Sequence, residues 1–210
     1  YHYKSRVIDS AFWVPQHRER IYIIGFKKEL NLEDQIEGIF PELPTERIYE
    51  LDNVLIPQNE LIEKFGDKYT LTLKTWETLV RHKKNHAEKG NGFGFGLIMP
   101  PFRGKVTRTI SARYYKDGAE ILISQGRGKR PRRLTPLEAC RLQGFPEKCI
   151  SYYNGEKTQP VSDHQAYRQF GNSVTVPVIR AIANKLVKLL EDKLVELGKA
   201  ELLQTQPLVA

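Results

Sequence analysis

Residues 20–26 read Arg20-Ile21-Tyr22-Ile23-Ile24-Gly25-Phe26. Most of this run is β-branched or aromatic, and such residues favour a strand because their side chains pack well on a pleated surface. A shorter strand is predicted at residues 5–8. We expect both strands to belong to one buried sheet, so the chain opens with β structure.

A row of polar side chains leads into this strand. Gln16, Arg18 and Arg20 occupy alternate positions, so an extended backbone would point all three to the same side. Guanidinium groups are planar, permanently charged and bidentate, which suits phosphate groups and the oxygens of base edges. The alternative is a solvated sheet edge that uses charge to prevent aggregation. The spacing alone leaves both interpretations open.

One short helix carries clear start and stop signals. Thr135 can cap its first turn, Pro136 suits the first helical position, and Glu138 completes a capping box. Gly144 then supplies a stop signal. The sequence therefore predicts a helix within residues 135–144.

The last helix is predicted from about Pro177 to Leu197, where Gly198 ends it. Its apolar residues repeat at helical spacing, so the resulting stripe must pack against another element. A further helix with a basic end is predicted between Tyr69 and Ala87.

The middle of the chain favours a small, irregular β region. It contains strand candidates at residues 106–110 and 119–123, and the turn signal Lys116-Asp117-Gly118. Residues 29–52 are acidic and rich in proline, which is typical of a loop-rich segment between two domains. We therefore place a domain boundary near Leu30.

The charge of the chain is concentrated in one stretch. The net charge is +8, with a pI near 9.4. Residues 100–133 contain two acidic and ten basic residues, an excess equal to that of the whole chain: Arg103, Lys105, Arg108, Arg113, Lys116, Arg127, Lys129, Arg130, Arg132 and Arg133. Such a balance favours an anionic partner such as nucleic acid or an acidic membrane surface.

Cysteine use and hydropathy narrow the class of protein. Cys140 and Cys149 lack paired metal-ligand spacing, which argues against a disulfide framework and a metal site and favours a reducing cytoplasm. No apolar run approaches the roughly 20 residues that cross a bilayer, and the amino end has no signal-peptide pattern. We expect no membrane partner. The chain begins with Tyr1 instead of Met, so we expect a piece of a longer protein.

Three further segments have two interpretations each. Residues 90–96 alternate glycine with Asn91, Phe93 and Phe95 but do not link a strand to a helix, so they are not a dinucleotide loop. They bring Phe93 and Phe95 close to a ligand, or form a turn with both rings in the core. Residues 107–115 are dense in hydroxyl and guanidinium groups that can bond DNA, or form an ordinary amphipathic strand. Residues 171–173 can bind an anion at a helix start, or simply cap that helix.

Three segments, taken in order, resemble the last conserved motifs of DNA cytosine-5 methyltransferases. Residues 15–20 contain the family's Gln-x-Arg-x-Arg motif as Gln16, Arg18 and Arg20. Residues 133–144 resemble its penultimate motif, and residues 165–174 resemble its last one. The sequence between these motifs resembles that of the Dcm-like bacterial enzymes, which modify the inner cytosine of CCWGG. The resemblance covers essentially the whole chain up to the final helix.

The resemblance implies an α/β fold in four parts. Residues 1–30 would be the C-terminal strands of a Rossmann-like catalytic domain, and residues 31–170 a small, mostly-β target-recognition domain that includes the helix at residues 135–144. Residues 171–198 would be a final helix that returns to the catalytic domain, followed by a loose tail at residues 199–210.

The resemblance also implies roles for individual residues. Arg20 would contact the flipped cytosine and its phosphate, with Gln16 and Arg18 supporting that catalytic site. Asn172 and Ser173 would touch S-adenosylmethionine. Residues from about 30 to 133 would dock in the major groove of double-stranded DNA. The basic stretch within them would follow the DNA phosphates. The expected DNA-binding residues are Asn91, Gly92, Phe93, Phe95, Arg108, Thr109, Ser111, Arg113 and Tyr114.

Family motifs that do not occur in the sequence limit the expected activity. The glycine-rich cofactor motif, the Pro-Cys nucleophile loop and the Glu-Asn-Val motif are not found. We therefore expect the chain to be inactive alone and to need an N-terminal catalytic half or a partner subunit. It would then be the smaller subunit of a split enzyme, an excised fragment, or a DNA-binding specificity module. The resemblance also implies that the enzyme belongs to a restriction–modification system. It implies a bacterial protein that works in the cytoplasm at the nucleoid.

Overall fold

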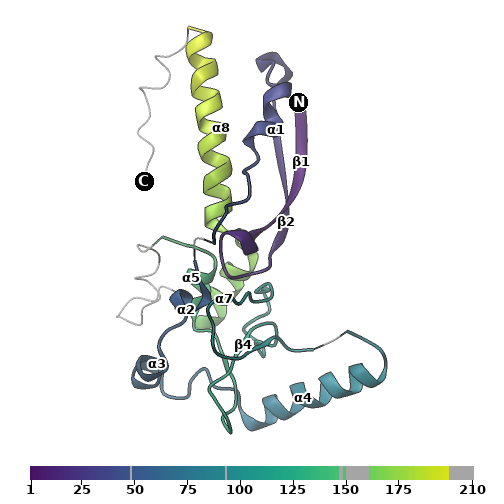
Figure 1. The fold of residues 1–210 in the computed structure, drawn as a ribbon, viewed down its shortest axis with the longest axis vertical. Helices are drawn as coiled ribbons and strands as arrows, with labels where there is room; N and C mark the ends of the chain where they lie inside the picture. The colour runs from purple at the N-terminus through teal and green to yellow at the C-terminus, as the bar shows by residue number, and fades with distance from the viewer. Residues whose placement is uncertain (48, 93, 147–148, 150–160, 199–210) are drawn as a thin grey trace. The chain divides into compact units, whose positions relative to one another are not determined.

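The structure is a computed structural model that describes residues 1–47, 49–92, 94–146, 149 and 161–198. The predicted loose tail at residues 199–210 lies outside the described residues. The chain divides into two compact units (Figure 1). The first unit comprises Tyr1–Ile8, Glu19–Leu43 and the segment from Pro177 onward, and the second comprises Asp9–Arg18 and Pro44–Val176.

A two-stranded sheet opens the first unit, as predicted. It pairs β1 (His2–Asp9) with β2 (Glu19–Phe26). In β2, Tyr22, Ile24 and Phe26 are buried, whereas the intervening Ile21 and Ile23 are 62% and 65% exposed. This alternation follows from the period of two in a strand. The prediction of a buried sheet therefore holds for one face only within this chain.

Helices complete the first unit. They are η2 (Lys28–Leu30), η3 (Glu33–Gln35), α1 (Ile36–Ile39) and the long α8 (Val176–Glu196), whose first residue is the last one of the second unit. Lys185 Nζ on α8 donates to the carbonyls of Gly38 and Phe40, at 3.1 and 3.3 Å.

The first unit extends beyond the predicted boundary near Leu30, as far as Leu43. Four apolar side chains explain this difference, because Leu32, Ile36, Ile39 and Phe40 are all buried. The sequence prediction missed these apolar residues because the composition of residues 29–52 is acidic and rich in proline overall.

The second unit combines short helices with a small sheet (Figure 1). Its helices are η1 (Ser10–Phe12), α2 (Leu51–Val54), α3 (Gln58–Phe65), α4 (Leu73–Glu88), α5 (Pro136–Leu142) and α7 (Asp163–Asn172). The sheet joins β3 (Leu97–Ile98) in parallel to β4 (Leu122–Ile123), and β4 antiparallel to β5 (Arg132–Arg133). The unit therefore has more helix and shorter strands than the expected mostly-β domain.

The predicted strand at residues 106–110 is wrong. Thr107 forms one isolated parallel bridge with Gln16, and the backbone N–H of Ile110 donates to the Gln16 side chain at 2.8 Å. Because a side chain replaces the next backbone partner, no ladder extends along this segment. The predicted strand at residues 119–123 shrinks to β4, while Gly118 adopts a left-handed φ of 65° at the predicted turn.

The predicted short helix is confirmed as α5. Thr135 Oγ1 accepts from the Glu138 N–H at 3.1 Å, and the Glu138 carboxylate accepts from the Thr135 N–H at 2.7 Å. The helix predicted between Tyr69 and Ala87 is confirmed as α4, but it begins at Leu73 with Thr72 as its cap. In Figure 1, α4 extends away from the rest of the second unit.

Residues 171–173 end a helix instead of starting one. Gly171 and Asn172 are the last residues of α7, and Ser173 is its C-cap. A Cβ atom at Gly171 would lie 2.3 Å from the backbone of Ser111 and Ala112. The absence of a side chain therefore lets α7 pack directly against the backbone of residues 111–112.

Candidate functional site

Arg18 gathers three distant parts of the second unit. Its side chain is 2% exposed. Nη1 donates to the Ile110 carbonyl at 3.0 Å, and Nη2 donates to the carbonyls of Gly171 and Ser173 at 2.8 and 2.5 Å. Hydrogen bonds from a charged group to buried carbonyls are stronger than neutral ones. We call Arg18 and these three carbonyls the Arg18 clamp.

Gln16 reinforces one side of the clamp. Its side chain is fully buried, and Oε1 accepts from the Ile110 N–H. The neighbouring His17 N–H donates to the Thr107 carbonyl at 2.9 Å, while Thr109 Oγ1 donates to the His17 carbonyl at 2.6 Å. Residues 15–18 and 107–110 are thereby fixed side by side.

Asp9 supports the clamp from behind. Its carboxylate accepts from the Arg18 and Ala11 N–H groups at 2.9 and 3.0 Å, and lies 2.7 Å from His17 Nδ1. Burial raises the pKa of Asp9, but the bonds from His17, Arg18 and Ala11 outweigh burial and lower this pKa from 3.8. The carboxylate is therefore charged and holds the backbone of Arg18.

The spacing of Gln16, Arg18 and Arg20 left open a row of donors on one side or a solvated sheet edge, and neither interpretation describes Gln16 and Arg18. Gln16 and Arg18 are buried in the second unit because backbone acceptors converge on them, so they cannot present a donor row to solvent. Arg20 belongs to the first unit, where it is half-buried and its Nη1 donates to the Glu19 carbonyl at 2.6 Å.

Asn172 and Ser173, the predicted cofactor contacts, lie next to the clamp. The Asn172 side chain is exposed at the end of α7. Ser173 is partly buried, and its Oγ donates to the Phe170 carbonyl at 2.8 Å. Since Arg18 binds the carbonyls on either side of Asn172, the backbone of this residue is held while its side chain faces outward.

The predicted DNA-contacting residues have mixed environments. Asn91, Gly92, Arg108 and Arg113 are exposed, whereas Thr109 and Ser111 are partly buried. Ser111 Oγ donates to the Glu120 carboxylate and accepts from the Arg113 N–H at 3.0 Å. Phe93 lies outside the described residues.

Tyr114 corrects one of these predictions. Its side chain is fully buried, its hydroxyl donates to the Ile121 carbonyl at 2.6 Å, and it accepts from the Leu134 N–H at 2.8 Å. Burial also raises the pKa of Tyr114 above its ordinary value. Tyr114 therefore braces the core, and its side chain does not face solvent.

Phe95 is also engaged within the protein. Its ring centroid lies 4.9 Å from that of Trp76, and Lys83 Nζ lies 4.7 Å from the same centroid. Because the ring attaches residues 94–96 to α4, the interpretation as a core-facing turn residue describes Phe95 better than an exposed ligand contact.

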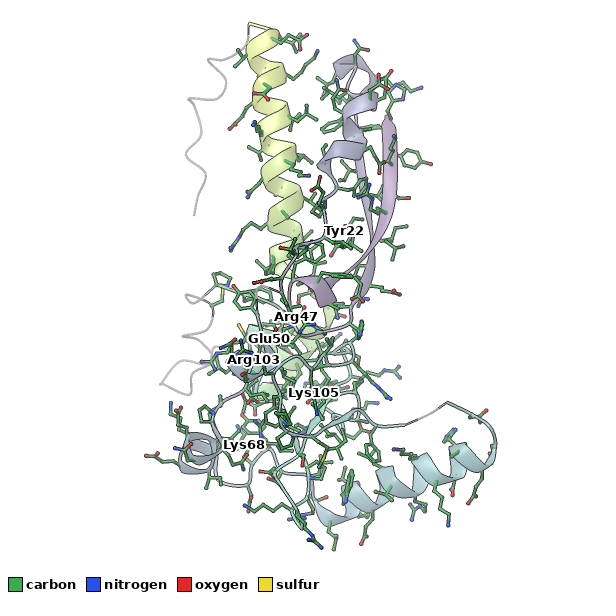
Figure 2. The ribbon with its side chains drawn as sticks, viewed as in Figure 1. Tyr22, Arg47, Glu50, Lys68, Arg103 and Lys105 are labelled. Atoms are coloured by element: carbon green, nitrogen blue, oxygen red, sulfur yellow. The ribbon has the colours of Figure 1, made fainter. Side chains whose placement is uncertain are left out.

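Four of the ten cations in residues 100–133 bind other protein groups. Lys105 and Arg108 donate to the carbonyls of Met99 and Gly94, both at 2.5 Å, and Arg133 donates to that of Tyr115 at 2.8 Å. The buried Arg132 forms two 2.8 Å bonds with Glu138. Figure 2 shows Arg103 and Lys105 near Arg47 and Glu50, and the Gly104 N–H between them donates to Glu50 at 2.8 Å.

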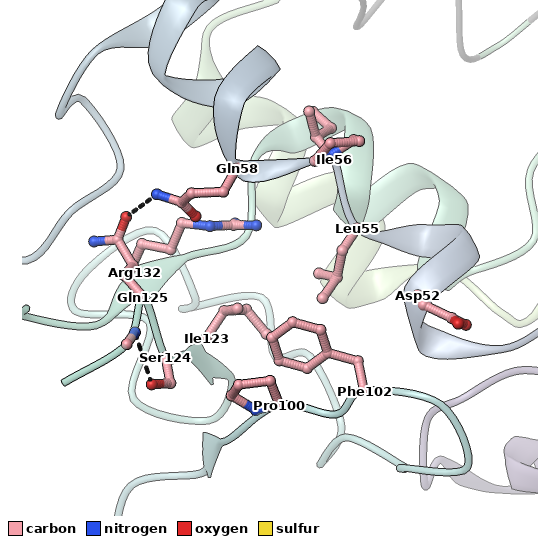
Figure 3. Close-up of a pocket in the computed structure, with 12 residues that line it drawn as sticks. Asp52, Leu55, Ile56, Gln58, Pro100, Phe102, Ile123, Ser124, Gln125 and Arg132 are labelled. Carbon is pink, nitrogen blue, oxygen red and sulfur yellow. Dashed lines mark hydrogen bonds between the residues drawn. The ribbon is translucent and has the colours of Figure 1, made fainter.

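A hollow of about 330 Å³ lies beside the small sheet (Figure 3). Phe102, Ile123 and Leu55 provide apolar walls, and Gln58 and Gln125 lie at its polar side. The Gln58 side chain donates to that of Gln125 at 2.7 Å. Sequence reasoning missed both glutamines, because isolated amides in polar segments carry no recognisable signal.

The described residues contain neither a cluster of metal-ligating side chains nor a membrane-spanning helix. No group of three or more His, Cys, Asp or Glu side chains there could hold a metal ion. In the same part of the chain, no helix has the length and apolar character needed to cross a membrane.

A family of known proteins matches most of the chain. The sequence model described as C-5 cytosine-specific DNA methylase matches residues 1–188. The chain is 44% identical over 206 residues to the DNA-cytosine methyltransferase of Escherichia coli K12, covering 90% of this chain and 40% of that protein. It is 46% identical over 183 residues to the type II methyltransferase M.DsaV of Dactylococcopsis salina, covering 87% and 46%.

Solved structures show the same fold at lower identity. The S. pombe Dnmt2 methyltransferase superposes with a TM-score of 0.55 at 18% identity, covering 93% of this chain and 58% of that one. The Entamoeba histolytica methyltransferase EhMeth gives 0.52 at 19% identity, covering 93% and 55%. The chain spans less than half the length of the two curated relatives described above.

Proposed function

Because the chain belongs to the C-5 cytosine-specific DNA methylase family, we propose that it is the C-terminal, DNA-recognising part of a DNA (cytosine-5)-methyltransferase. The observation that carries this proposal is the Arg18 clamp. One guanidinium binds the backbone beside Thr109 and Ser111, on the proposed DNA side, and the backbone around Asn172, on the proposed cofactor side.

The clamp would set the distance between target and cofactor. Methyl transfer needs its two reactants held in one geometry, and small displacements lower the rate strongly. Arg18 and Gln16 would act as positioning residues, since their bonds go to backbone groups of the protein. The side chains of Thr109, Ser111 and Asn172 would make the outward contacts.

The residues near the end of α7 fit S-adenosylmethionine, which supplies the methyl group when bound. Asn172 is exposed and offers both a donor and an acceptor. Ser173 Oγ already donates to Phe170 and keeps acceptor capacity for an amine. These two side chains would form one wall of the cofactor site.

Base extrusion gives Arg20 its proposed role. Rotating a cytosine out of the duplex costs roughly a few kcal/mol, which protein contacts must offset. Arg20 is half-buried and bonded to the neighbouring Glu19 carbonyl. Its guanidinium would exchange that bond for the flipped cytosine and its phosphate.

The first unit has an apolar face that further polypeptide would cover. Tyr3, Val7, Ile21 and Ile23 are each more than 60% exposed on the two strands. Contiguous exposed apolar surface favours an interaction site. We assign this face to the catalytic half of the enzyme, because the curated relatives are more than twice as long as the matched region.

Neither cysteine with described surroundings suits the nucleophile. Cys140 is fully buried, and burial raises the pKa of its thiol to about 12. Since the thiolate is the attacking form, Cys140 would stay protonated and inert. Cys149 is half-buried and packs against the same core cluster. The attacking cysteine would come from the other half, so this chain would be inactive alone.

Reconstitution tests the proposal. The chain is mixed with, or joined to, the region of the Escherichia coli enzyme outside the match, and transfer of a labelled methyl group to a CCWGG duplex is measured. We expect transfer only when both parts are present, and a large loss with Arg20→Ala. Lys27→Ala, an exposed change in the same unit, is the control.

Each result separates the alternatives. Activity on mixing separate chains indicates a split enzyme, and activity only after covalent joining indicates an excised piece. Specific DNA binding without transfer in any combination indicates a specificity module. Methyl transfer by the isolated chain would contradict the proposal. A methyltransferase of bacterial DNA would work in the cytoplasm at the nucleoid.

A further inference from the structure

The loop between β4 and β5 is the most strongly charged exposed segment of the second unit's small sheet. We define the cationic loop as Gly126-Arg127-Gly128-Lys129-Arg130. All five residues are exposed. Among the described residues, its three cationic side chains form no ion pair or side-chain hydrogen bond within the protein. Their charges are therefore available to a ligand.

A network of amides fixes the shape of this loop. Gln125 Nε2 donates to the Arg130 carbonyl at 2.8 Å and to Thr70 Oγ1 at 2.9 Å. Its Oε1 accepts from Gln58 Nε2 at 2.7 Å (Figure 3). The Lys129 N–H closes the turn onto the Gly126 carbonyl at 3.3 Å. The single side-chain amide of Gln125 thus connects the loop to α3 and to Thr70.

The end of the loop is anchored as well. Pro131 accepts from the Leu71 N–H at 3.0 Å. Arg132, next in sequence, is held by Glu138 through two 2.8 Å bonds. Because hydrogen bonds hold both ends and the turn of the cationic loop, the loop loses little conformational freedom when it binds a ligand.

A hollow of the protein surface lies beside the cationic loop. A hollow of about 340 Å³ is lined by Gly128, Lys129 and Arg130 on the loop side and by Gln58, Ile62, Asp67, Thr70 and Gln125. Asp67 is the carboxylate among these lining residues, and Thr70 Oγ1 donates to it at 3.4 Å. An added Cβ at Gly126 or Gly128 would meet nothing within 4 Å, so a ligand can approach the main chain.

We propose that the cationic loop grips the sugar-phosphate backbone of duplex DNA and that Gln125 positions it. This inference rests on the proposed function. A duplex presents one negative charge per ~1.7 Å of helix axis, which matches three cations on five consecutive residues better than the sparse charges of an acidic peptide do. Guanidinium forks also bind phosphate in a bidentate manner. The loop adds affinity without reading bases.

Salt dependence measures this contact directly. The triple variant Arg127→Gln, Lys129→Gln, Arg130→Gln is compared with the unchanged 210-residue chain by fluorescence anisotropy on a labelled duplex, from about 0.05 to 0.3 M KCl. Each lost phosphate contact lowers the slope of log K against log[KCl] by about 0.9. We expect a slope shallower by about 2–3 and equal losses on target and random duplexes.

A matched control removes the same charge elsewhere. Lys27→Gln, Lys28→Gln and Lys188→Gln change three exposed lysines of the first unit, and we expect a slope change below about 1. Gln125→Ala keeps all three charges but releases the loop. It should weaken binding severalfold with a slope change below about 1.

Several results would overturn the inference. These are no binding of the unchanged chain at the lowest salt, equal slope losses in loop and control variants, or an unaltered Gln125→Ala affinity. Displacement of the duplex by poly-glutamate as effectively as by unlabelled duplex would indicate a general anion surface instead. Because methyl transfer is not measured, the inference can fail while reconstitution succeeds, and the reverse also holds.

Discussion

Arg18 and the cationic loop use the same side chain in opposite ways. Arg18 is 2% exposed and binds three backbone carbonyls, whereas Arg127 and Arg130 are exposed and bind no acidic side chain among the described residues. In sequence, both segments carry two arginines close to a strand. The difference lies in how many acceptors the fold brings to each guanidinium. Burial converts a potential ligand contact into a structural bond.

The same contrast occurs within three residues. Arg130 is exposed on the cationic loop, while Arg132 is buried against Glu138. Glu138 also accepts from the Ile56 N–H at 2.8 Å. Glu138 therefore ties both β5 and the segment before α3 to α5. Only part of the basic stretch can serve a ligand.

The largest effect is expected when the stability of the Arg18→Met variant is compared with that of the Arg127→Met variant. Removing the Arg18 guanidinium leaves two buried carbonyls and one partly buried carbonyl without their donor, so we expect the free energy of unfolding to fall by about 3 kcal/mol or more. The Arg127 change should alter it by less than about 0.5 kcal/mol. Urea unfolding followed by tryptophan fluorescence measures both.

A similar loss of unfolding free energy in the two arginine variants would contradict the distinction between a structural and a ligand-binding arginine. So would a reversed order, in which Arg127→Met destabilises the protein more. DNA binding provides the complementary readout, since Arg127→Met should lower the salt slope by about 0.9.

A smaller effect is expected where the clamp meets α7. Gly171→Ala places a methyl group 2.3 Å from the backbone of Ser111, so residues must move apart and about 1–3 kcal/mol of stability should be lost. Gly38→Ala is the control, because a Cβ there meets nothing within 4 Å and the residue lies in α1. That change should be neutral or stabilising by up to about 1 kcal/mol. Thermal melts of both proteins check the difference.

The smallest effect concerns Asp9 and pH. Its pKa is lowered in the folded state, so its charge stabilises the fold above the unfolded value of 3.8 and this contribution is lost as pH falls through the lowered folded value. Asp9→Asn should therefore cost about 1 kcal/mol at neutral pH. Below pH 3.8 the gap between the two proteins should narrow steadily.

Urea midpoints at neutral and acid pH test the sign. A gap that widens on acidification would show that Asp9 is not the stabilising charge behind Arg18. A constant gap would show that its hydrogen bonds do not depend on ionisation.

Elements with local signals could be predicted from the sequence. The capping box of α5, the turn at Gly118 and the strand β2 each depend on neighbouring residues, and each was found where expected. The clustering of charge was also visible. The family resemblance rested on three short motifs, and comparison with known proteins supports it.

Features that depend on distant partners could not be predicted. Nothing near Arg18 in the sequence announces carbonyls at residues 110, 171 and 173, and nothing near Tyr114 announces that Leu134 will bond its hydroxyl. The missed helix α7 did carry a local signal. Ser162 accepts from the Gln165 N–H at 3.3 Å, which is the serine–glutamine spacing of a helix start.

The Arg18 clamp has an evolutionary consequence. Its bonds to residues 110, 171 and 173 all end on main-chain oxygens, which every amino acid provides. The side chains at positions 109, 111 and 172 can therefore be exchanged while the scaffold stays in register. A protein built this way can acquire a new specificity by few substitutions, without redesigning the frame that presents them.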